Sequence, residues 1–120
     1  MNKTLIAMGF LVLMNSTPVL ASIDRYVSDV EKTSDQYSLD MKVFLRSLDP
    51  KITQFNTQQQ TQFCGIVKKY VDDMYLTTDQ NRQSLPPSAQ SMSKQNIIDK
   101  VMTSPEMQLL QRYNIQCILN

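Results

Sequence analysis

The chain has 120 residues, with 12 lysines and arginines against 11 aspartates and glutamates, so its formal net charge is +1. A nucleic-acid binder normally carries a marked basic excess, so this balance argues against a nucleic-acid partner. The chain has no histidine and no tryptophan. Because histidine is the usual proton shuttle and metal ligand near neutral pH, catalytic triads and most transition-metal sites are excluded. We therefore expect no enzyme activity, no metal site and no cofactor.

The N-terminus has the layout of a secretory signal peptide. Lys3 precedes an apolar run at residues 5–14, a polar segment follows, and Ala21 completes a small-x-small cleavage pattern. The apolar run is too short to cross a bilayer, which takes about 20 apolar residues in a helix. We expect a cleaved signal peptide at residues 1–21, one α-helical domain at residues 22–120 with no membrane span, and a periplasmic or secreted location.

An amphipathic pattern runs from about residue 23 to residue 48. Its apolar residues recur at steps of three, four and seven, which describes one stripe of a helix. Asp49 before Pro50 ends the pattern, since the residue before a proline avoids helical angles. The poor helix formers at residues 33–36 leave a break open, but the stripe keeps its phase, so we expect one continuous helix. The stripe consists of Tyr26, Val27, Val30, Tyr37, Met41, Phe44, Leu45 and Leu48.

A second amphipathic segment is predicted at about residues 57–80. Either Asn56 or Thr57 can serve as its N-cap, and glutamines fill its first turn. The sequence LPPS at residues 85–88 ends any helix that reaches it. Because the two segments have similar lengths, we expect them to form a long antiparallel helical hairpin.

Two shorter helices are predicted after this loop, at about residues 93–103 and 105–113. Ser93 can cap the first of them, and Ser104 followed by Pro105 is a strong start signal for the second. No segment shows the alternation typical of a strand. We therefore expect an all-α fold, in which the two short helices cover the long hairpin in a four-helix bundle-like arrangement.

The two cysteines, Cys64 and Cys117, are expected to form one disulfide. An exported chain with an even, minimal cysteine count is typical of a structural disulfide. Two thiols without histidine are too few ligands for a zinc site, and a catalytic redox pair usually stands as C-x-x-C. The two short helices together measure about 30 Å, enough to return the tail to Cys64. We expect Ile115, Ile118 and Leu119 to cover the flank of the second helix.

Two further sets of residues have simple structural interpretations. The pairs Lys68/Asp72 and Lys69/Asp73 are i,i+4 neighbours, as expected on a solvated helix face. Five methionines after the predicted leader could suggest a soft-metal or promiscuous binding surface. Four of them fall on predicted core stripes, so we assign them to packing. The five are Met41, Met74, Met92, Met102 and Met107.

A third set consists of residues that miss the predicted core stripes. Gly65 points about 145° away from the middle of the stripe of the second helix, and lowers helix stability by about 1 kcal/mol relative to alanine. The aliphatic residues that also miss the stripes have three interpretations. They are ordinary exposed side chains, they are covered by the short helices, or they form a surface for a partner. The candidate partner surface consists of Leu39, Val43, Gly65, Ile66, Lys69 and Leu76.

In general format, a small exported α-helical protein with one disulfide is similar to secretion-system immunity proteins, periplasmic helical chaperones and secretin pilotins. No motif in the chain chooses among them. We expect a non-enzymatic binding protein that acts as an inhibitor or immunity protein by occluding a protein partner, since a rigid helix face suits that role. The alternative is a periplasmic chaperone or a pilotin-like secretion or assembly factor that binds envelope proteins. A homodimer stays open in either case.

Overall fold

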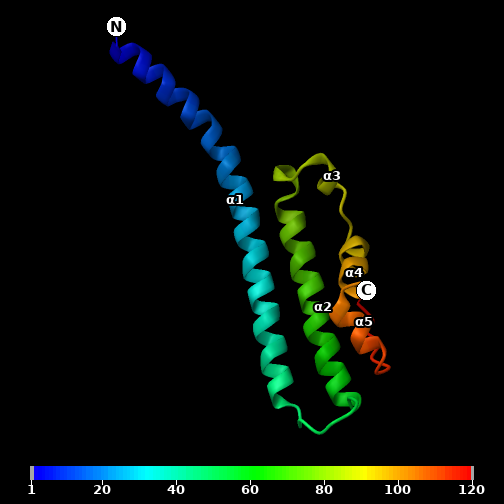
Figure 1. The fold of residues 1–120 in the computed structure, drawn as a ribbon. Coiled ribbons are helices and arrows are strands. Elements are labelled where there is room, and N and C mark those ends of the chain that lie inside the picture. The colour runs from blue at the N-terminus through cyan, green and yellow to red at the C-terminus, as the bar shows by residue number, and fades with distance from the viewer. Residues whose placement is uncertain (1, 120) are drawn as a thin grey trace.

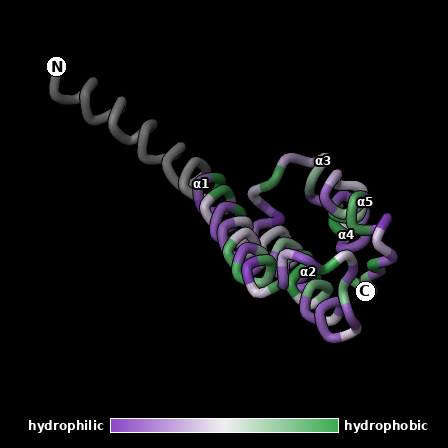
Figure 2. The backbone as a smooth tube through the Cα atoms, turned by 60° about the horizontal axis from the view of Figure 1, so that its bottom comes forward, coloured by the Kyte–Doolittle hydropathy of each residue, from purple (hydrophilic) through white to green (hydrophobic). Residues whose placement is uncertain are grey.

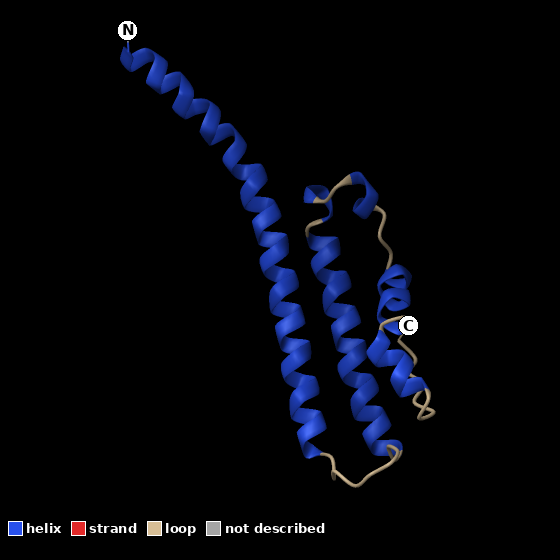
Figure 3. Ribbon diagram, viewed as in Figure 1, coloured by secondary structure: helices blue, strands red, loops and turns tan. Residues whose placement is uncertain are grey.

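The computed structural model describes the backbone of residues 2–119 and the side chains of residues 23–119. No strand occurs in that part of the chain, so the expected all-α fold is confirmed (Figure 3). The helices follow in the order α1 (Asn2–Ser47), α2 (Thr57–Gln80), the 3₁₀ helix η1 (Arg82–Ser84), α3 (Pro87–Gln90), α4 (Lys94–Met102) and α5 (Pro105–Gln111).

α1 and α2 run side by side as the expected antiparallel hairpin, and α4 and α5 lie along α2 (Figure 1). The end of α1 and both ends of α2 agree with the predicted bounds within one residue.

α1 begins at Asn2 and not near residue 23, because the helix continues into the predicted leader. The leader at residues 1–21 lies outside the residues whose side chains are described, so the signal peptide stays a prediction. No helix in the described part is long and apolar enough to cross a membrane.

The helices begin where local capping signals place them. Asn56 Oδ1 accepts a hydrogen bond from the Gln59 backbone N–H at 2.7 Å, and Gln59 Oε1 accepts one from the Asn56 N–H at 2.9 Å. This capping box satisfies two backbone donors at the start of α2. Ser93 and Asn96 form the same arrangement at α4, and Ser104 caps α5. The predicted start signals of these helices are therefore confirmed.

α1 continues through residues 33–36 without a break, as predicted. The Thr33 hydroxyl donates to the carbonyl oxygen of Asp29 at 3.0 Å, so it bonds along the helix. Tyr37 then packs on Tyr70 of α2, with ring centroids 4.4 Å apart. Burial, with a smaller effect of the Tyr70 hydroxyl, raises the pKa of Tyr37. This contact anchors α1 to α2 just after the weak segment.

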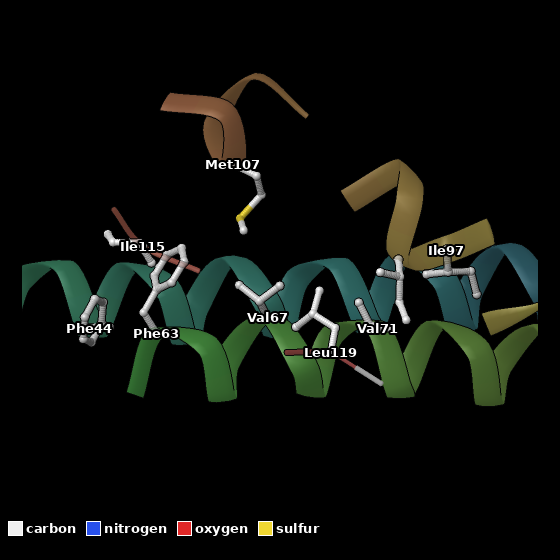
Figure 4. Packing of buried hydrophobic residues seen from close by; sticks show 9 residues of the cluster. Phe44, Phe63, Val67, Val71, Ile97, Met107, Ile115 and Leu119 are labelled. Carbon is white, nitrogen blue, oxygen red and sulfur yellow. The ribbon is translucent and has the colours of Figure 1, made fainter. Parts of the chain in front are cut away.

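The core is small and lies where α1, α2, the short helices and the C-terminal tail meet. Val67 and Val71 of α2 are fully buried, and Phe44 of α1 packs against Phe63 with ring centroids 6.1 Å apart. Figure 2 shows hydrophobic and hydrophilic residues alternating along both helices of the hairpin. The buried cluster consists of Phe44, Phe63, Val67, Val71, Ile97, Ile98, Met107, Ile115 and Leu119 (Figure 4).

One prediction about the core is wrong, and another is confirmed. Val27 and Leu45 belong to the predicted stripe of the first helix but are 48% and 51% exposed. α4 packs mainly against α2, so the covered sector of α1 is narrower than its apolar stripe. The methionines assigned to core stripes do serve packing, because Met107 is buried in the cluster and the others are partly buried against it.

The loop between α2 and α4 is more structured than the sequence predicts. Pro87 opens α3, because a proline suits the first turn of a helix as well as it ends one. The Arg82 guanidinium donates to the carbonyl oxygens of Gln90 at 2.6 Å and Met92 at 3.1 Å, and to the Asp79 carboxylate at 3.0 Å. These bonds tie the loop to the end of α2 and set the position at which α4 begins.

The disulfide between Cys64 and Cys117 is present as predicted, with the two Cα atoms 5.2 Å apart. The tail after α5 is not helical, and its side chains alternate between buried and exposed as in an extended chain. Ile115 and Leu119 are 2% and 3% exposed and cover α2 as expected, whereas Ile118 is 86% exposed. The prediction for Ile118 is wrong because neighbouring side chains of an extended segment point to opposite sides.

Replacing Cys64 and Cys117 together by alanine should lower the free energy of unfolding by about 4 kcal/mol, because the bond closes a long loop in the unfolded chain. Urea unfolding followed by circular dichroism measures the change. The wild-type protein in reductant is the control and should shift by a similar amount. Equal stability of the oxidised and reduced proteins would contradict a structural role for the bond.

Candidate functional site

A groove of about 640 Å³ lies between α1 and α2 and is lined by residues of these two helices alone. No residue of α4, α5 or the described tail lines it, so the short helices leave the groove uncovered, and Phe44 belongs both to the groove lining and to the core. Five of the six residues predicted as a partner surface line this groove. They are Leu39, Val43, Gly65, Ile66 and Lys69.

Leu76 is the predicted surface residue that the groove does not include. It is 53% exposed and lies about three turns along α2 from Gly65. The two residues share nearly the same direction on the helix, but the lining on α2 extends only from Gln62 to Lys69. The predicted surface therefore included Leu76 because of its direction on the helix, although it lies too far along α2 to line the groove.

Side chains project further from the α1 wall of the groove than from the α2 wall. Leu39 and Val43 project from α1 one turn apart, 55% and 61% exposed. Ile66 on α2 is partly buried against the core cluster. Beside it, a Cβ atom added to Gly65 would meet no other atom within 4 Å. The groove thus has a raised apolar edge on α1 and a low, open edge on α2.

A charge cluster lies at one end of the groove. Lys69 Nζ is 3.7 Å from Asp40 Oδ2 across the two helices and 3.9 Å from Asp73 Oδ2 on its own helix. Gln36 donates a hydrogen bond of 2.8 Å to Asp40 Oδ1. Because the Lys69 side chain is 54% exposed, these pairs contribute little to stability. They leave charged groups available at the surface of the groove.

The other predicted pair, Lys68 and Asp72, serves the contact between α2 and α4. Asp72 Oδ1 is covered and has no aligned hydrogen bond, but it lies 2.7 Å from Lys94 Nζ of α4. Asp72 Oδ2 lies 3.3 Å from Lys68 Nζ. The Lys94 ammonium, assisted by Lys68, holds the pKa of Asp72 below its usual value. This network holds α4 on the hairpin.

A second, polar cleft of about 720 Å³ lies near the other end of α2, around Arg25, Asp79 and Arg82. Arg82 is already engaged there by the loop that precedes α4. Within residues 23–119, no cluster of three or more histidine, cysteine, aspartate or glutamate side chains could hold a metal ion. The apolar groove is therefore the stronger candidate for a functional site.

Sequence reasoning missed the polar lining of the groove, which includes Asp40, Ser47 and Gln62. Asp40 and Ser47 stand three and four residues from Val43, so helical spacing places all three on neighbouring positions of α1. That spacing could have identified them.

The fold and the groove define a small all-α protein, a helical hairpin held by one disulfide, with an open apolar groove between its two long helices. Comparisons of the chain with protein-family models, curated proteins and solved structures find no significant match.

Replacing Gly65 by alanine should raise the free energy of unfolding by about 1 kcal/mol, because alanine favours the helix and the added methyl group meets open space. Leu76→Ala is the control at an exposed position of the same helix and should change stability by less than about 0.5 kcal/mol. Both are measured by urea unfolding. A destabilised Gly65→Ala protein would show that the backbone of α2 requires glycine there.

Replacing Asp72 by asparagine should reduce stability at neutral pH by at most about 1 kcal/mol, since the side chain is 39% exposed. The folded state lowers the pKa of this carboxyl, so its contribution is present above the pKa of the unfolded chain, about 4. It disappears as the pH falls through the lower folded pKa. Urea unfolding at several pH values, with Asp73→Asn as control, measures stability against pH. The curves of the wild type and of Asp72→Asn should converge in acid. A constant difference would refute the linkage.

Proposed function

We propose that this chain is a small exported, non-enzymatic binding protein that occludes a protein partner, in the manner of an inhibitor or immunity protein. The observation that carries the proposal is the apolar groove between α1 and α2, in which four residues outside the core lie together with Ile66 at the edge of the core. Contiguous apolar surface on a small domain favours an interaction site.

The stiffness of the groove supports occlusion. Both walls are long helices, α2 is fixed at its start by a capping box, and the disulfide attaches the tail to the same helix. A surface that is ordered before binding loses little conformational entropy when it meets a partner. A groove built in this way suits tight binding to one shape better than adaptation to many.

The exported location is supported by the disulfide, because such bonds persist in oxidising compartments and are rare in the cytosol. The signal peptide predicted at residues 1–21 agrees with that compartment. The non-enzymatic part of the proposal rests on composition, since the chain has no histidine for proton transfer.

The chaperone or pilotin-like alternative predicts a methionine-lined cradle that adapts to several clients. The groove is lined by leucine, valine, isoleucine and glycine beside polar residues, and no methionine belongs to that lining. Specific occlusion of one partner therefore fits the groove better than promiscuous binding.

Immobilised oxidised protein, incubated with envelope extract, should retain one stoichiometric partner. Val43→Lys places a charge in the raised wall of the groove and should reduce the retained amount at least tenfold. Leu109→Lys, at an exposed apolar position of α5, is the matched control and should retain as much as the wild type. Circular dichroism verifies that both variants fold.

Two outcomes of this experiment would contradict the proposal. Many substoichiometric clients would favour the chaperone alternative. A partner that binds the Val43→Lys variant as well as the wild type would show that the groove is not the binding surface.

A further inference from the structure

The groove carries both halves of a self-complementary contact. Val43 projects from α1, whereas Gly65 leaves open space on α2. The ion pair of Lys69 with Asp40 marks one level of the hairpin, and the packing of Phe44 on Phe63 marks another. Val43 and Gly65 both lie between these two levels. Val43 and Gly65 therefore lie at about the same position along the hairpin axis, on opposite walls of the groove.

A two-fold axis parallel to the hairpin would exploit this arrangement. Such an axis, placed over the groove, lays α1 of a second copy over α2 of the first. The rotation leaves the position of every residue along the hairpin axis unchanged. Val43 of each copy then meets Gly65 of the other, because contacts across a two-fold axis are reciprocal. An axis perpendicular to the hairpin would instead lay α1 on α1 and oppose the projecting residues to one another.

The charges obey the same symmetry. The parallel axis lays Asp40 of one copy over Lys69 of the other, since the two residues share one level. Lys69 is 54% exposed and its contacts within the chain are long, 3.7 and 3.9 Å, so its ammonium can turn outward at little cost. The chain as a whole is nearly neutral, so two copies do not repel each other strongly.

We propose that a second copy of this chain covers the groove, in a two-fold dimer in which α1 of each copy packs over α2 of the other. Four long helices then enclose Leu39, Val43 and Ile66 of both copies, as in the core of a four-helix bundle. The apolar walls lose their contact with water, and two equivalent pairs of Asp40 with Lys69 close one end of the interface.

This inference rests on the proposed function, because the dimer uses the same groove as the protein partner. The dimer is the state in which the groove is covered, and the monomer is the state that binds. The contact is formed by one short groove per copy, so it belongs to the small, weak class of interfaces. We expect a dissociation constant between about 1 µM and 1 mM, weak enough for a partner to displace the second copy.

Analytical ultracentrifugation of the purified, oxidised protein over this concentration range tests the dimer. The wild type should shift from monomer to dimer, and the Leu109→Lys control should behave in the same way. Val43→Lys and Gly65→Leu should remain monomeric, the first because of its charge and the second because it fills the position that Val43 needs. Thermal unfolding of each variant verifies that it is folded.

A mixing experiment tests the orientation of the two copies. Lys69→Asp leaves two facing carboxylates and Asp40→Lys leaves two facing ammonium groups, so each variant alone should be monomeric. An equimolar mixture restores opposite charges at both reciprocal contacts and should form a heterodimer. Interactions within a single chain cannot produce this result, because neither variant contains an opposite pair at these two positions.

Three outcomes overturn the proposal: a wild type that stays monomeric up to about 1 mM, a dimer that persists in Val43→Lys, or a mixture that stays monomeric. The proposed function is judged separately by the envelope retention experiment. A monomeric protein that retains its partner through Val43 keeps the proposed function and loses the dimer. A dimer restored by mixing, without any retained partner, supports the dimer and contradicts the proposed function.

Discussion

The covalent bond between Cys64 and Cys117 keeps the C-terminal tail against α2, and the small core is completed only by that tail. Ile115 and Leu119 bring the tail's apolar surface into the cluster, although the tail forms no helix. Ordering an irregular segment loses conformational entropy at each residue, and few backbone hydrogen bonds offset the loss here. The bond reduces that loss in advance, because it restricts the unfolded chain.

The closure of the core on one side of the hairpin determines what remains on the other. α2 is apolar toward the core, and Gly65 and the partly buried Ile66 line the groove, to which neither the short helices nor the described tail contribute a residue. The groove between the two long helices is the consequence. Both proposals, occlusion of a partner and pairing with a second copy, concern this uncovered surface, and competition between them would link the protein's concentration to its availability for binding.

Features that depend on a few neighbouring residues could be predicted. The caps at Asn56, Ser93 and Ser104 satisfy backbone donors within their own turn, so they needed no tertiary information. Apart from the disulfide and the pairing of the two long helices, features that depend on contacts between distant parts of the chain could not. The exposure of Ile118 follows from an extended tail, and the order of the loop before α4 follows from Arg82, which binds carbonyl groups that no side-chain pattern reveals.

For this protein, the sequence alone determined the two long helices, α4 and α5, the antiparallel pairing of the long ones, the disulfide and the direction in which Gly65 points. These follow from helical periodicity, loop length and cysteine chemistry, which are properties of the chain itself. Only the tertiary structure decided that Leu39, Val43 and Ile66 share a groove while Leu76 does not. That outcome depends on the register of α1 against α2, set by the packing of Tyr37 on Tyr70 and of Phe44 on Phe63, and helical periodicity contains no information on such a register.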